Sequence, residues 1–156
     1  MPYRTFARTW MVAALAAGAL VACEHERPPP PGKVEVIAAP AGIEIPPWVH
    51  DRIIAARGRQ VIVYVGAPWC EPCKHFHDAL ASGQLDAAFP RLTVLEFDQD
   101  RDADHLMAAG YTSRLIPLFV RPRPDGQASD RSIEGSIKGA GAVAEITPRL
   151  RELLVN

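Results

Sequence analysis

The stretch GAPWCEPCKHFHD, residues 66–78, decides how this sequence is interpreted, because two cysteines stand three positions apart in it. Before the pair runs QVIVYVGA, residues 60–67, a continuous β-rich segment that is typical of a central strand covered on both faces. After the pair, apolar residues recur at helical spacing until a Ser-Gly pair ends the segment. Cys70 and Cys73 therefore lie where a strand passes into a helix. They could form a redox pair, a metal clamp or two buried thiols.

The junction between strand and helix favours redox chemistry. The Cys70 sulfur is expected to lie near unpaired backbone N–H groups at the positive end of the helix dipole, which favours the thiolate. Cys73 falls one turn later on the inward face, close enough to attack a mixed disulfide formed at Cys70. Pro72 suits the first helical turn, which has no N–H bond to lose. We predict an exposed, attacking Cys70 and a less exposed, resolving Cys73.

The rest of the chain alternates helices with strands. In the first helix Trp48, Ile53 and Ile54 fall at helical spacing, and the last helix is expected to begin with Thr147 as N-cap and Pro148 as its first residue. The expected order is a helix at 46–58, a strand at 60–67, a helix at 70–82, a strand at 91–100, a helix at 102–110, strands at 115–122 and 132–137, and the final helix. Such alternation predicts an α/β sheet with helices on both faces.

The 156 residues leave room for one domain with appendages. The formal net charge is −1 with both signs interspersed, so no basic surface for a nucleic acid backbone is expected. No internal repeats are evident.

The N-terminal residues predict export. Two arginines precede an apolar run at 10–22, which is shorter than the ~20 residues that a membrane helix needs, so we predict a signal peptide over 1–22. LVAC, residues 20–23, resembles the lipobox of bacterial lipoproteins, which implies that Cys23 is lipidated and becomes the first residue of the mature protein. An ordinary secretory signal or an uncleaved anchor is the alternative. Each of these would also place the domain outside the cytoplasm.

A proline-rich segment follows Cys23. Four consecutive prolines, Pro28 to Pro31, impose an extended conformation that packs neither as helix nor as sheet. We predict that 23–44 is a tether and that 45–156 is the globular domain.

WCEPCK, residues 69–74, resembles the active site of thioredoxin-like proteins, and YTSRLIPLF, residues 111–119, resembles the family segment that contains a cis proline. The resemblance covers 45–156. It implies a thioredoxin fold with a mixed sheet of about four strands flanked by helices on both faces. It also implies a cis Ile116-Pro117 bond, and a substrate groove shaped by Trp69, Ile116 and Pro117.

Two departures from the family pattern concern proton transfer and redox direction. Tyr64 stands where thioredoxin has a buried aspartate that moves the proton of the inner thiol. In this chain that proton would have to pass to water or to Glu96, although Glu96 is interpreted chiefly as a solvated strand residue. A carboxylate at Glu71 disfavours the Cys70 thiolate, and Lys74 partly offsets this effect. We therefore expect a reductant or mild exchanger. The Glu-Pro dipeptide is shared with the reductases of cytochrome c maturation.

The predicted function is that of a cell-envelope thiol-disulfide oxidoreductase without an organic cofactor or metal. Its expected partners are protein thiols and disulfides outside the cytoplasm and an upstream thiol donor, with the membrane reached through the lipid anchor. Two alternatives remain: a copper(I) or zinc module that uses Cys70, Cys73 and His77, or a redox-inert interaction module.

Overall fold

The computed structural model describes residues 32–155. The predicted signal peptide, Cys23 and the proline run lie outside the described residues. Within 32–155 the chain forms β1 (Glu35–Ala38), α1 (Ile45–Ala55), β2 (Gln60–Gly66), α2 (Glu71–Ala81), β3 (Leu92–Asp98), α3 (Ala103–Ala108), β4 (Leu118–Val120), β5 (Ser132–Glu134) and α4 (Ala142–Val155). In this part of the chain no helix is both long and apolar enough to cross a membrane.

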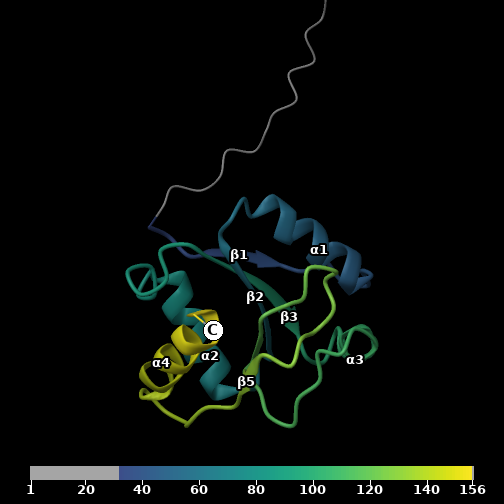
Figure 1. Cartoon of the computed structure of the whole chain (residues 1–156). Coiled ribbons are helices and arrows are strands. Elements are labelled where there is room, and N and C mark those ends of the chain that lie inside the picture. Colours follow the sequence, from purple (N-terminus) through teal and green to yellow (C-terminus); the bar gives the residue numbers. More distant parts are fainter. Residues whose placement is uncertain (1–31, 156) are drawn as a thin grey trace, which may run out of the picture.

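The strands form a single mixed sheet in the order β1-β3-β2-β4-β5. The first three strands in the sequence run parallel, β4 pairs antiparallel with β2, and β5 closes a hairpin with β4. The two helices α2 and α4 cover one face, while α1 and α3 cover the other (Figure 1). The predicted α/β class, with helices on both faces of a mixed sheet, is confirmed. The sheet has five strands instead of about four.

The additional strand is β1, and it corrects the predicted tether. Its four residues pair with β3 from Glu35 opposite Thr93 to Ala38 opposite Glu96. The side chains of β1 alternate between half-buried and exposed, as expected for an edge strand covered on one side. The segment 35–38 therefore belongs to the sheet. The sequence prediction missed it because the strand is short and follows the proline run closely.

The central strand explains the continuous apolar run in the sequence. All residues of β2 after Gln60 are buried, since the strand lies between β3 and β4 and beneath helices on both faces. On the side of α2 and α4, the rings of Tyr64, Phe76 and Phe119 pack together with centroid distances of 4.8 to 5.3 Å. This aromatic cluster lies directly under the helix that carries the cysteines.

Two helix predictions need correction. The final helix begins at Ala142, not at Thr147, and contains Pro148 in its interior. Ala142, Ile146 and Leu150 recur every four residues on its buried face, and this packing outweighs the missing N–H of the proline. In α1, Ile54 is 65% exposed although it falls at helical spacing. The helix rests on the sheet through the buried Ile45 and Val49, and the predicted Trp48 and Ile53 pack half-buried against the same cluster.

Candidate active site

The two cysteines form a disulfide at the N-terminus of α2. Their sulfur atoms are 2.11 Å apart, and their Cα atoms 5.2 Å. Cys70 is the N-cap of the helix, and the backbone N–H of Cys73 donates to the Cys70 sulfur at 3.3 Å. An N–H aimed at this sulfur stabilises negative charge on it once the disulfide is reduced. Pro72 occupies the first turn, as predicted.

The two cysteines differ in exposure less than the sequence predicts. Cys70 is 6% exposed and Cys73 is 2% exposed, so the prediction of an openly exposed attacking sulfur is wrong for the oxidised protein. The segment before β4 shelters it, since the Ile116 carbonyl oxygen lies 3.6 Å from the Cys70 sulfur. The order of exposure, with Cys73 the deeper residue, matches the prediction.

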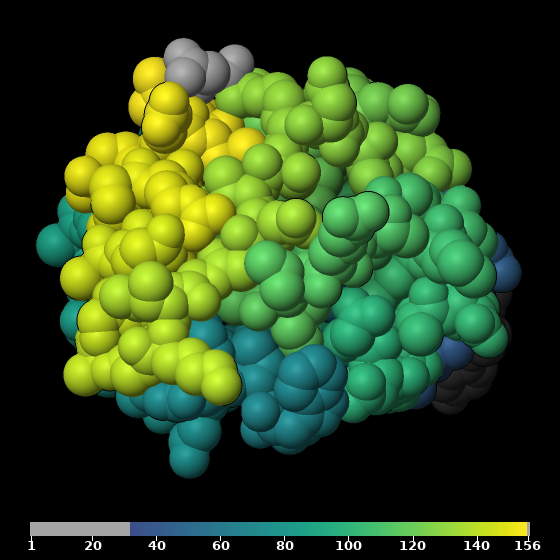
Figure 2. All heavy atoms as spheres, turned by 90° about the horizontal axis from the view of Figure 1, so that it is seen from below, coloured from purple at the N-terminus to yellow at the C-terminus, as the bar shows by residue number. Residues whose placement is uncertain are grey.

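Exposed apolar side chains on the segments that adjoin the start of α2 form an apolar rim at this end of the molecule. Trp69 is 67% exposed, and its Nε1–H donates to the Asp100 carboxylate at 2.7 Å. The predicted cis bond between Ile116 and Pro117 is present. Figure 2 views this end of the molecule, where the teal start of α2, the green segment before β4 and the yellow-green segment before α4 adjoin.

Two further residues of this rim were missed in the sequence. Leu115 is 59% exposed and Ile137 is 55% exposed. They belong to the connections that enter β4 and α4, and no motif in the sequence marks them. Only the fold brings these connections to the same end of the sheet as Trp69.

Tyr64 takes the position behind the disulfide. It is 2% exposed, and its hydroxyl donates to the Cys73 carbonyl oxygen at 3.3 Å. Burial, assisted by the Glu96 carboxylate, raises the pKa of Tyr64 well above its ordinary value. The phenol therefore stays protonated at physiological pH and cannot serve as a base. Gly66 leaves the space that this hydroxyl occupies, because a Cβ there would lie 2.4 Å from it.

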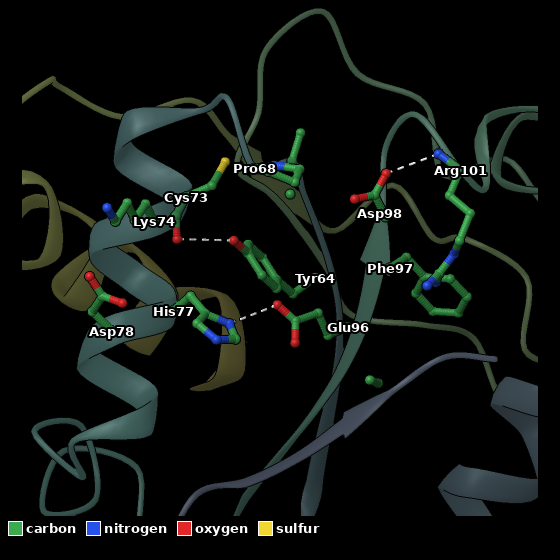
Figure 3. Close-up of a pocket in the computed structure, with 13 residues that line it drawn as sticks. Tyr64, Pro68, Cys73, Lys74, His77, Asp78, Glu96, Phe97, Asp98 and Arg101 are labelled. Atoms are coloured by element: carbon green, nitrogen blue, oxygen red, sulfur yellow. Dashed lines mark hydrogen bonds and ion pairs between the residues drawn. The ribbon is translucent and has the colours of Figure 1, made fainter. Parts of the chain in front are cut away.

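A pocket of about 560 Å³ extends from Cys73 along α2 and β3. His77 of α2 and Glu96 of β3 meet across it at hydrogen-bond distance, with Nδ1 and Oε1 3.0 Å apart (Figure 3). The Glu96 side chain is 24% exposed, so this strand residue is half-buried at the pocket and is less solvated than the sequence predicts. In Figure 3 the Cys73 sulfur lies at the Pro68 end of the pocket, with Tyr64 between it and the His77–Glu96 contact.

Two of the residues predicted to tune the pair, Glu71 and Lys74, lie in the first turn of α2 and differ in their contacts. One Glu71 oxygen accepts a hydrogen bond from the backbone N–H of Gly139 at 3.0 Å, and it lies 3.9 Å from His75 Nε2. Lys74 is exposed and lines the pocket beside Cys73. The carboxylate is thus bound to another part of the chain, a contact for which the sequence gives no signal.

The geometry does not favour the metal hypothesis. Across 32–155 no group of three or more His, Cys, Asp or Glu side chains is arranged to hold a metal ion. Cys70 and Cys73 are bonded to each other, and the His77 ring is paired with Glu96.

No family model matches the chain, and neither does any curated protein sequence. Among solved structures it is similar to a wild-type thioredoxin h from poplar, with 27% identity, 80% of this chain and 99% of that chain covered, and a TM-score of 0.50. A redox protein from Chlamydomonas reinhardtii is 16% identical, with 81% of this chain and 37% of that chain covered, and a TM-score of 0.50. A thioredoxin from Trypanosoma brucei brucei is 17% identical, with 78% and 93% covered, and a TM-score of 0.47. The chain therefore has a thioredoxin fold, and its Cys70–Cys73 disulfide supports thiol-disulfide oxidoreductase activity.

Proposed function

We propose that this chain is a cell-envelope thiol-disulfide oxidoreductase that reduces or exchanges disulfides of other proteins. The single observation that carries the proposal is the disulfide at the N-terminus of α2, where the Cys73 N–H points at the Cys70 sulfur. A disulfide between residues three apart closes too short a loop to contribute much chain entropy, so a structural role explains it poorly.

The reaction is a pair of thiol-disulfide exchanges. In the reduced protein the Cys70 thiolate attacks a client disulfide, so that a bond forms between Cys70 and one client sulfur while the other client sulfur leaves as a thiolate. The Cys73 thiol then loses its proton and attacks the Cys70 sulfur. The Cys70–Cys73 bond re-forms, and the second client sulfur leaves. Two electrons pass to the client, and an upstream dithiol of the envelope restores the reduced protein.

Residues around Cys70 bear on the direction of transfer. The helix N-terminus stabilises the Cys70 thiolate and thereby makes the pair more oxidising, whereas the adjacent Glu71 carboxylate disfavours the thiolate. Lys74 offsets part of the charge of Glu71. We propose that the balance leaves a reductant or mild exchanger.

Trapping of mixed disulfides tests the exchange. The Cys73→Ala variant should accumulate covalent adducts with envelope proteins that disappear on treatment with dithiothreitol, because its Cys70 can attack but no thiol resolves the product. Cys70→Ala is the matched control and should form none. Equal adduct levels in both variants would contradict the assigned roles.

The reduction potential, measured against glutathione buffers, tests the direction. A reductant or mild exchanger is expected to fall below about −180 mV, the value of protein disulfide isomerase. A potential near about −120 mV, typical of a strong oxidant, would refute the proposed direction while leaving the exchange chemistry intact.

We also propose that the domain is held at the outer side of a bacterial membrane by lipid on Cys23. The lipobox-like LVAC after the signal-like segment supports this location. Mass spectrometry of the N-terminal peptide should find an acylated Cys23, and Cys23→Ser should move the protein into the soluble extracytoplasmic fraction. An unmodified, soluble wild-type protein would refute the anchor.

A further inference from the structure

The contact between Glu71 and Gly139 joins two parts of the chain that are 68 residues apart. Glu71 stands between the two cysteines as the first residue of α2, and Gly139 lies in the segment 135–141, which connects β5 to α4. We propose that Glu71 is a positioning residue that holds the segment 135–141 beside the disulfide and thereby sets how tightly client segments bind. This inference rests on the proposed function.

The segment 135–141 contacts both sides of the Cys70 site. At its start, the Gly135 N–H donates to the Pro117 carbonyl at 2.8 Å, and the Leu115 Cδ1 lies 3.1 Å from where a Gly135 Cβ would be. Further along, Gly139 bonds to Glu71. The segment thus connects the peptide that shelters Cys70 with the helix that carries it, and Ile137 lies between these two attachments.

The segment 135–141 is rich in glycine and needs hydrogen bonds from other parts of the chain to hold it in place. It contains three glycines, and Gly135 and Gly139 adopt positive φ values of 67° and 84°. A Cβ at Gly139 would meet no heavy atom of residues 32–155 within 4 Å, so no side chain of this part of the chain packs against that position. Because glycine-rich backbone loses much entropy when it is ordered, contacts with other parts of the chain have to hold it. Arg149 donates to the Gly135 carbonyl and Ser136 to the Glu145 carboxylate, while Glu71 accepts from the Gly139 N–H in the half of the segment nearer the cysteines.

The hydrogen bond between Glu71 and Gly139 matters for function because the segment that it holds carries Ile137. Its side chain is 55% exposed, and its Cδ1 lies 3.0 Å from where a Gly141 Cβ would be, so Gly141 makes room for it. With Trp69 and Leu115 it belongs to the exposed apolar rim at the end of the molecule where the segments before β4 and α4 adjoin the start of α2. A client segment that offers an apolar side chain next to its disulfide would contact this rim, and its affinity depends on Ile137 being held in place.

Glu71 therefore has two separable effects, one through charge and one through contact. Glutamine at this position keeps an oxygen that can accept from Gly139 but removes the charge, while alanine removes both. His75→Ala is the matched control, since it removes the ring 3.9 Å from the carboxylate and leaves the Gly139 contact.

The experiment compares wild type, E71Q, E71A and H75A with insulin as the disulfide substrate and dithiothreitol as the electron donor. We expect the KM of E71A for insulin to exceed that of E71Q by about 3- to 10-fold, the loss of one hydrogen bond, with kcat changed less than about twofold. Amide hydrogen exchange at Gly139 should be faster in E71A and unchanged in E71Q and H75A.

Equal KM values for E71Q and E71A, or equal Gly139 exchange in E71A and wild type, would overturn the positioning role and leave only a charge effect. A wild-type protein that does not reduce insulin would instead count against the proposed function. The exchange measurement on the oxidised protein would still test the contact in that case, so the two failures are distinguishable.

Discussion

Replacing Gly66 by alanine tests how the buried tyrosine and the resolving cysteine share space. A Cβ at position 66 would lie 2.4 Å from the Tyr64 hydroxyl oxygen, 2.8 Å from its Cζ and 3.4 Å from the Cys73 Cβ. Since favourable contacts between heavy atoms lie near ~3.5 Å, the hydroxyl would have to move by about 1 Å. The ring cannot yield freely, because it packs against Phe76 and Phe119 at 5.2 and 5.3 Å.

The size of the effect follows from two contributions. Overpacking a core by one methyl group costs about 1–3 kcal/mol, and displacing the hydroxyl from the Cys73 carbonyl costs about 1 kcal/mol more. We therefore expect Gly66→Ala to lower the free energy of unfolding by about 2–4 kcal/mol. Urea unfolding of the oxidised protein, with an unchanged m-value, measures it.

A double-mutant cycle with Tyr64→Leu supplies the refutation. Leucine lacks the atoms that clash, so Gly66→Ala should cost less than about 0.5 kcal/mol in that background, a coupling of at least about 1.5 kcal/mol. If Gly66→Ala costs the same in both backgrounds, the hydroxyl is not what excludes a side chain at position 66, and the reasoning fails.

Three further changes test other parts of the structure. Phe76→Ala, at a fully buried ring, should cost about 3–5 kcal/mol in urea unfolding, and a cost under about 1 kcal/mol would contradict the packing. Pro148→Ala restores a helical N–H at an exposed position and should raise the urea midpoint; a lower midpoint would show that the proline suits α4. The Ser113 hydroxyl, with the Arg114 N–H, holds the pKa of the Glu134 carboxyl below its usual range, so this stabilisation is present at neutral pH and is lost as pH falls through the lowered pKa. Glu134→Gln should therefore lower Tm at pH 7 and leave it unchanged in strong acid, where a constant difference would refute the assignment.

The centre of the fold could be predicted because local pattern and burial agree there. A central strand must be apolar on both faces, so β2 is evident as a continuous run, and the helix that follows begins where the cysteine motif places it. The order of the remaining elements follows from the alternation of periodicities. Cys70 and Cys73 were found for the same reason, since their spacing is local.

Features that depend on tertiary contacts could not be predicted. The strand β1 is defined by its pairing with β3, and its four residues carry little signal of their own. The start of α4 was placed too late because Pro148 fits a first helical turn, and only packing reveals that it lies inside the helix. The Glu71 contact with Gly139 and the hydrogen bond between His77 and Glu96 join residues from different elements of the fold.

The parallel pairing of β1 with β3 places the start of the described chain and the disulfide at opposite ends of the sheet. Glu35 lies opposite Thr93, whereas Gly66, which leads to the cysteines, lies opposite Asp98. Five residues of strand separate these positions, about 17 Å at roughly 3.3 Å per residue. The start of β1 thus lies at the end of the sheet opposite the disulfide. Coupling to a bead or sensor chip through the N-terminal side would leave the end of the domain that carries the disulfide facing the solution.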